Sequence, residues 1–202
     1  MVSTDVYRTI KETAEGEISE KRSKFLAFAH PVKNVDEVKE WVEYYQKKYY
    51  DARHCCYAYM LGPERKDFRA NDNGEPSGTA GKPILGQINS YELTDILIVV
   101  IRYFGGIKLG TSGLIQAYKA AAIEAIEAAD IIEKTVDEDV TFYFEYPFMN
   151  QVMRIVKEEE PSIVRQGYDN DCSMTLRIRK GNMSRLKDRL EKVETLRFDT
   201  EI

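Results

Sequence analysis

Six consecutive apolar residues at positions 96–101 constrain the fold of this chain more than any other segment. A run of this length suits one strand buried on both faces, and it is far shorter than the roughly 20 apolar residues that cross a bilayer. Glycines follow the run, and the alanine-rich stretch at 114–129 predicts a helix lying close to a sheet, because alanine adds little radius. The pattern predicts an α/β domain around a central strand.

The segments before this run predict further elements of the same domain. Apolar residues at 25–32 and 55–61 predict two strands, and the polar composition of residues 62–73 predicts a loop. Between the strands, Asn34 is a suitable helix N-cap with Glu37 three residues later. The buried face of that helix is predicted to consist of Val35, Val38, Val42, Tyr45 and Tyr49, with Trp41 packed beside it.

The last third of the chain has a complete strand and helix pattern of its own. The charged, weakly periodic stretch at 130–139 is the predicted boundary, which gives domains at 1–133 and 134–202. Strands are predicted at 140–144, 163–168, 172–178 and 196–198, with a turn at 169–171. A first helix is predicted to begin at Pro147 and a second to cover 183–193, after a break at Gly181 and Asn182. The order βαββαβ predicts a ferredoxin-like domain.

Composition excludes several classes of protein. The net charge is −5 and neither half is basic, with 17 basic and 20 acidic residues in 1–133 and 12 and 14 in 134–202, so bulk electrostatic coating of nucleic acid is not expected. The first residues have no basic segment followed by an apolar run, and Cys55, Cys56 and Cys172 do not suggest a disulfide framework. We therefore expect a cytoplasmic protein without a membrane span. Two histidines without metal-ligand spacing predict no metal, and no cofactor is expected.

The glycine-rich loop at 73–83 is the first of two segments that could hold an anion. Its backbone N–H groups could line a concavity, with side-chain donors from Ser77, Thr79 and Lys82. A tight surface turn that needs glycine for its backbone conformation explains the same composition equally well.

The second segment, at 105–113, lies between the central strand and the alanine-rich helix. The N-terminus of that helix would offer unpaired N–H groups, with Thr111 or Ser112 as the cap. Arg102, Lys108 and Lys119 are the only charged residues between positions 96 and 123, so the local field is positive. A nucleotide P-loop is disfavoured because Thr111 stands where the phosphate-binding lysine is required. A capped helix packed against its sheet is the simpler interpretation.

The sequence contains no clear catalytic constellation. His54 and Cys55 are neighbours in a predicted strand, so their side chains should point to opposite faces. Glu75 beside Ser77 remains the one candidate for a general acid or base.

Two motifs together resemble the signature of the YigZ/IMPACT family, and the resemblance covers nearly the whole chain. The motif residues are His54, Gly74, Glu75, Pro76, Gly78, Gly81, Tyr103, Phe104, Gly105, Gly106 and Gly110. The resemblance implies an N-terminal α/β domain of the ribosomal-protein and GHMP-kinase-like superfold, followed by a ferredoxin-like domain. Ser112 and Gln116 depart from the glycine and arginine common at these positions in the family.

The family implies a role in translation, since its eukaryotic members regulate translation by binding a protein activator of a stress kinase. We therefore expect a non-enzymatic protein that engages RNA, the ribosome or a translation factor through residues 73–119, without sequence-specific DNA binding. A second RNA-facing surface could be formed by Arg177, Arg179, Lys180, Arg185, Lys187, Arg189 and Lys192, although such a run is also typical of a solvated helix face. The alternative is an enzyme that acts on a small phosphorylated or carboxylated metabolite bound at the glycine-rich loops.

Overall fold

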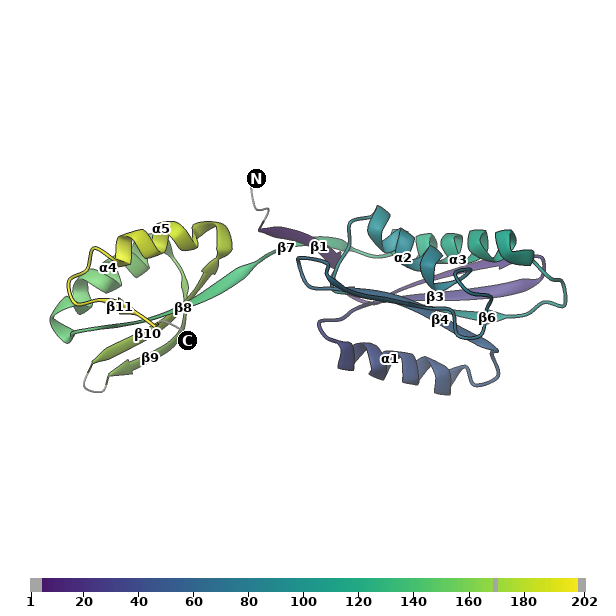
Figure 1. Ribbon diagram of the computed structural model, residues 1–202, viewed down its shortest axis with the longest axis horizontal. Coiled ribbons are helices and arrows are strands. Elements are labelled where there is room, and N and C mark those ends of the chain that lie inside the picture. Colours follow the sequence, from purple (N-terminus) through teal and green to yellow (C-terminus); the bar gives the residue numbers. More distant parts are fainter. Residues whose placement is uncertain (1–4, 169–170, 200–202) are drawn as a thin grey trace. The chain divides into compact units, whose positions relative to one another are not determined.

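The computed structural model describes residues 5–168 and 171–199, and the chain divides into two compact units (Figure 1). One unit is Tyr7–Lys134, and the other combines Thr135–Ile202 with Met1–Val6. Strands β1 (Val6–Ile10) and β7 (Ile131–Thr135) pair as a two-stranded sheet at the division. The predicted boundary stretch at 130–139 therefore contains a strand, because backbone pairing with β1 forms β7 whatever the charge of its side chains.

The unit Tyr7–Lys134 is built on a five-stranded antiparallel sheet with β6 (Ile96–Tyr103) in the middle. Its strands lie in the order β2 (Ala14–Glu20), β3 (Ser23–Pro31), β6, β4 (His54–Leu61) and β5 (Asp67–Asn71). All six apolar residues at 96–101 are fully buried, which confirms the central strand predicted from their run. The cross-strand partners of Arg102 are Phe25 on β3 and His54 on β4.

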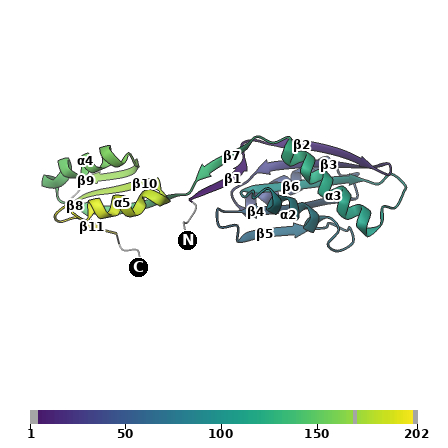
Figure 2. The same ribbon diagram turned by 90° about the horizontal axis from the view of Figure 1, so that it is seen from above.

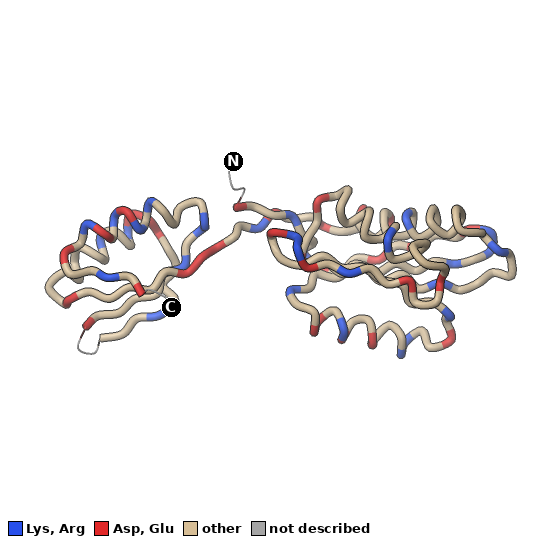
Figure 3. Tube along the Cα trace, in the orientation of Figure 1, with Lys and Arg blue, Asp and Glu red and all other residues tan. Residues whose placement is uncertain are grey.

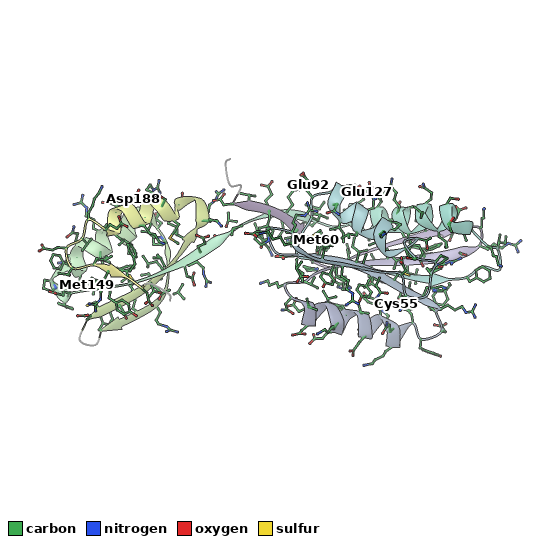
Figure 4. All side chains as sticks on the ribbon, in the orientation of Figure 1. Cys55, Met60, Glu92, Glu127, Met149 and Asp188 are labelled. Carbon is green, nitrogen blue, oxygen red and sulfur yellow. The ribbon has the colours of Figure 1, made fainter. Side chains whose placement is uncertain are left out.

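Helices cover both faces of this sheet (Figure 1). Helix α1 (Val35–Lys48) packs on one face, and α2 (Gly81–Ser90) and α3 (Gly110–Glu127) pack on the other. Figure 2 shows α3 crossing β2 and β3. Figure 4 places Cys55 on the side of α1, whereas Met60 belongs to the core beneath α2 and α3. The Asn34 cap is confirmed, since the backbone N–H of Glu37 donates to its Oδ1 at 2.9 Å.

Three local predictions for this unit were wrong. Residues 62–73 were predicted as a loop, but β5 forms there because pairing with β4 supplies its backbone partners at a solvated sheet edge. The last residues of the glycine-rich loop open α2, which the sequence did not predict. Helix α3 begins at Gly110 after Leu109, without a side-chain cap, so neither Thr111 nor Ser112 is the cap.

The second unit contains a four-stranded antiparallel sheet in the order β11, β8, β10, β9. Along the chain its elements are β8 (Asp137–Phe144), the 3₁₀ turn η1 (Tyr146–Phe148), α4 (Met149–Glu159), β9 (Ser162–Tyr168), β10 (Cys172–Arg179), α5 (Lys180–Leu190) and β11 (Arg197–Phe198). Alternating residues of β8 and β10 join apolar residues of α4 and α5 in one core. The predicted break at Gly181 and Asn182 is wrong, because both residues lie inside α5. The predicted turn includes 169 and 170, which lie outside the described residues.

Candidate anion-binding site

A pocket of about 400 Å³ opens where β6 ends, β4 begins and α3 starts. The sheet register creates this meeting point, because it sets His54 directly beside Arg102. The loop after β5 closes another side. The pocket is lined by Arg53, His54, Glu75, Pro76, Arg102, Phe104, Lys108, Leu109, Gly110, Thr111 and Leu114.

A buried ion pair forms the floor of the pocket. Nη1 of Arg102 donates to Glu75 Oε1 at 2.6 Å, and the Tyr118 hydroxyl donates to the same oxygen at 2.8 Å. The side chains of Arg102 and Glu75 are only 7% and 3% exposed. Breaking such a pair leaves one charge buried without compensation, which is strongly destabilising. Glu75 therefore anchors Arg102, and its Oε1 is shared by two donors.

The guanidinium of Arg102 is also held by aromatic rings. Its Cζ lies 5.6 Å from the ring centroids of both Phe25 and Phe104. Phe25 is fully buried, whereas Phe104 is 48% exposed at the pocket. Nε of Arg102 is buried and has no hydrogen-bond partner among the described residues. This position leaves a cationic donor group in the pocket wall without all of its partners.

His54 presents its ring to the same floor. Its Nδ1 lies 3.0 Å from the Asn73 carbonyl oxygen, and since that oxygen only accepts, Nδ1 carries the hydrogen. The other ring nitrogen, Nε2, lies 4.0 Å from Glu75 Oε1. The tautomer is thus fixed by the loop, and Nε2 is the ring nitrogen that faces Glu75.

The thiols near the site are not activated. The Sγ atom of Cys56 contacts both the Asp72 carbonyl oxygen at 2.9 Å and the Tyr118 hydroxyl at 3.3 Å. Burial raises the pKa of Cys56, and it raises the pKa of Cys55 on the opposite face to about 12. Burial likewise raises the pKa of the Tyr118 hydroxyl. Nucleophilic cysteines have lowered pKa values, so these two belong to the core.

The glycine-rich loop holds an anion, and that anion is the carboxylate of Asp72. Its Oδ2 accepts from the backbone N–H of Gly78 at 2.8 Å, and its Oδ1 accepts from Ala80 at 3.0 Å and Gly81 at 2.8 Å. Burial alone would raise the pKa of Asp72, but these three donors outweigh it and lower the pKa. The predicted nest of backbone donors exists, and it is satisfied within the chain.

The predicted anion-binding residues separate into three groups. Arg102, Lys108 and Thr111 come together in the pocket. Ser77 is exposed on the loop and Lys82 is exposed in the first turn of α2, both outside the pocket. The buried Thr79 hydroxyl donates to the Pro76 carbonyl oxygen at 2.6 Å.

The remaining two lie further along α3. Ser112 lines a separate hollow with Gln116, so the two departures from the family pattern lie side by side. Lys119 is exposed and does not line the pocket.

Sequence reasoning missed two of the residues that shape the site. Arg53 is a single basic residue before a strand, and nothing in its neighbourhood distinguishes it. Asp72 directly precedes Asn73 and Gly74, and an acidic residue before a glycine-rich loop is the signal that could have found it.

Two motif glycines are required by close backbone approach. A Cβ at Gly105 would lie 2.0 Å from the carbonyl carbon and oxygen of Arg22, and one at Gly81 would lie 2.5 Å from the Asn71 backbone nitrogen. No side chain fits at either position without movement of the backbone. Gly105 thus fixes the chain between β6 and α3, where the pocket opens.

Basic and acidic residues are interspersed along the second unit (Figure 3), and most residues of the basic run are paired with acids. Arg177 forms two hydrogen bonds with Asp139 at 2.7 and 2.9 Å. The remaining pairs are Arg179 with Asp5, Lys180 with Glu138, Arg185 with Glu159, and Arg189 with Glu158 and Glu159. Because neighbouring carboxylates neutralise most of these charges, this run offers less to a polyanion than its composition suggested.

No group of three or more histidine, cysteine, aspartate or glutamate side chains within the described ranges could hold a metal ion. No helix in the part of the chain that the structure describes is long and apolar enough to cross a membrane.

The fold and the pocket together define a two-unit α/β protein with a basic site on its larger unit. The chain belongs to the IMPACT family: the family model of the Impact N-terminal domain matches residues 21–126, which include every residue that lines the pocket. It is 35% identical to IMPACT family member YvyE of Bacillus subtilis over 154 residues, covering 76% of this chain and 71% of that protein. It is 33% identical to IMPACT family member YigZ of Escherichia coli over 150 residues, covering 73% and 74%.

A solved structure agrees over both units. The crystal structure of a hypothetical protein superposes with a TM-score of 0.75 at 26% identity and covers 98% of each chain.

Proposed function

We propose that this protein is a translation-associated binding protein that engages RNA, free or within the ribosome, through the pocket around Arg102. Membership of the IMPACT family supports a role in translation. We also propose a cytoplasmic location, a ribosomal-protein and GHMP-kinase-like superfold for the first unit and a ferredoxin-like fold for the second. The strand order β11, β8, β10, β9 supports the last assignment.

One observation carries the RNA proposal: three cationic side chains and an uncapped helix N-terminus meet around one pocket. Arg53 and Lys108 are exposed at its rim, and Arg102 lies in its wall. The positive end of the α3 dipole and the backbone N–H groups of its first turn add to this field. Glu75, the only acid among the described residues that line the pocket, already accepts from Arg102 and Tyr118. The pocket is locally suited to phosphate although the whole chain is acidic.

The test is a salt titration of RNA binding with the double variant Arg53→Ala/Lys108→Ala. Arg102 is left intact because its removal would leave the charge of the buried Glu75 without its ion-pair partner. With a labelled single-stranded RNA followed by anisotropy, the magnitude of the logarithmic salt slope should be smaller in the double variant, by roughly 0.7 for each phosphate contact that is lost. Lys39→Ala is the matched control, because Lys39 is an exposed lysine of α1, on the other face of the sheet. An unchanged affinity and slope in the double variant would refute the site.

A second candidate function is an enzyme that acts on a small phosphorylated or carboxylated metabolite. The volume of the pocket supports it, because about 400 Å³ lies within the range of small-ligand sites. His54 Nε2 and Glu75 would be the proton-transferring groups. Oε1 of Glu75 already accepts from both Arg102 and Tyr118, which is why we favour binding. Turnover of such a metabolite that is abolished by Glu75→Gln would reverse that preference.

A further inference from the structure

We propose that the pocket binds the 5′-terminal phosphate of a nucleotide, with the attached base stacked on Phe104. This inference rests on the proposed function and specifies the ligand of the same site. The shared chemistry is a phosphate monoester on an aromatic nucleoside, which either a free nucleotide or the 5′ end of an RNA can supply.

The shape of the site favours a terminal group over an internal stretch of RNA. Proteins that track a strand use an extended basic groove with successive stacking platforms. Here the basic residues surround one pocket of about 400 Å³, and Phe104 is the one phenylalanine, tyrosine or tryptophan among the described residues that line it. Lys82 and Lys119, which could extend a path, do not line it. The lining therefore suits one phosphate and one base.

The charges of the site favour a monoester over a diester. A phosphate monoester carries about 1.5 to 2 negative charges at neutral pH, against one for a diester in the backbone. Arg53, Lys108 and Arg102 line the pocket together with the first residues of α3. Only one nitrogen of Arg102 is taken by Glu75, and its buried Nε lacks a partner among the described residues. Thr111 adds a hydroxyl at the same rim.

Phe104 is placed as a stacking platform. Its ring is 48% exposed, although large aromatic side chains usually bury most of their surface. Arg102 lies 5.6 Å from its centroid and is itself fixed by Glu75 and by Phe25, so the ring has a rigid support. A base stacked on this ring would cover apolar surface beside the phosphate-binding groups.

Calorimetry with three probes separates the two halves of the ligand. Adenosine 5′-monophosphate should bind more tightly than ribose 5-phosphate, and adenosine should bind least. Lys108→Ala should weaken both phosphorylated probes by about tenfold, because each loses one charge-assisted contact. Phe104→Leu should weaken adenosine 5′-monophosphate by about tenfold and leave ribose 5-phosphate unchanged. Leucine keeps an apolar side chain at this exposed position, and the fluorescence of Trp41 verifies that the variant is folded.

A second set of probes identifies the source of the nucleotide and separates this inference from the proposed function. A 5′-phosphorylated oligoribonucleotide, its 5′-hydroxyl form and a circular RNA of the same sequence are compared with adenosine 5′-monophosphate. If the 5′-phosphorylated oligonucleotide binds more tightly than the mononucleotide, the ligand is an RNA end; if the mononucleotide binds more tightly, the ligand is a free nucleotide. Either result supports the site. Equal binding of all three RNAs, without binding of the mononucleotide, overturns this inference but leaves RNA binding intact. Failure of every RNA to bind would refute the proposed function itself.

Discussion

Replacing Asp72 should remove the hydrogen bonds that hold the glycine-rich loop against the start of α2, and it should destabilise the larger unit. The carboxylate accepts three backbone hydrogen bonds, from Gly78, Ala80 and Gly81, at 2.8 to 3.0 Å. The N-cap residue of α2 is Ala80, whose side chain cannot accept a hydrogen bond. Asp72, directly after β5, therefore caps the helix in its place. In Asp72→Ala all three donors lose their partner at once.

The cost follows from the number and the exposure of these bonds. A lost cap or a lost bond to a charged group typically costs about 1 to 2 kcal/mol each. Because Asp72 is only partly buried, water replaces some of the lost partners, and we expect about 2 to 4 kcal/mol in total for Asp72→Ala. Asp72→Asn keeps one acceptor oxygen and should cost about 1 to 2 kcal/mol. These are large fractions of the roughly 5 to 15 kcal/mol that stabilises a domain.

Urea unfolding followed by the fluorescence of Trp41 is the appropriate assay. Trp41 is the only tryptophan of the chain and lies on α1, so it reports on the unit that contains Asp72. Asp36→Asn is the matched control, because the Asp36 side chain is 85% exposed and pairs only with Lys39, and its loss should cost under about 0.5 kcal/mol.

The pH dependence supplies a second test of the same bonds. The pKa of Asp72 is lower in the folded chain than in the unfolded one, so its contribution is present above the ordinary aspartate pKa and is lost as the pH falls through the folded value. The stability gap between wild type and Asp72→Asn should therefore shrink in acid. A gap below about 0.5 kcal/mol at neutral pH for Asp72→Ala would refute the reasoning.

Two further predictions concern the core of the same unit. Gly105→Ala should destabilise the larger unit by more than about 2 kcal/mol in the same urea assay, because the new Cβ would lie 2.0 Å from the Arg22 backbone. Gly86→Ala is the matched control within α2: nothing lies within 4 Å of its Cβ, and the change should stabilise the helix by about 0.5 to 1 kcal/mol. Burial lowers the pKa of His30 from 6.5 to about 4, so the unfolded chain binds more protons between these values, and thermal stability measured by circular dichroism should rise with pH across that window. His30→Gln should flatten this rise, and a slope equal to that of wild type would contradict the assignment.

Much of the fold could be predicted because its signals are local. The apolar run at 96–101 predicted the central strand, and Asn34 with Glu37 predicted the start of α1. The strands and helices of the second unit occur in the predicted order, since each carries its own periodicity. The predictions that were wrong concern segments where strand pairing or helix packing overrides composition. Examples are β5 at the sheet edge and α2, which begins with Gly81 and contains Pro83 in its first turn.

The sequence by itself indicated that glycine-rich turns flank a buried strand and that basic residues gather beside the second turn. It left open whether the loop at 73–83 holds an anion or is a tight surface turn. Only the tertiary structure decided which residues meet. It filled the loop with the carboxylate of Asp72, and it placed Glu75 under Arg102, 27 positions away. The register of β4 on β6 then brought His54 to the same pocket. Periodicity and capping act within a few residues, whereas these partnerships depend on strand register and helix packing, which no short segment encodes.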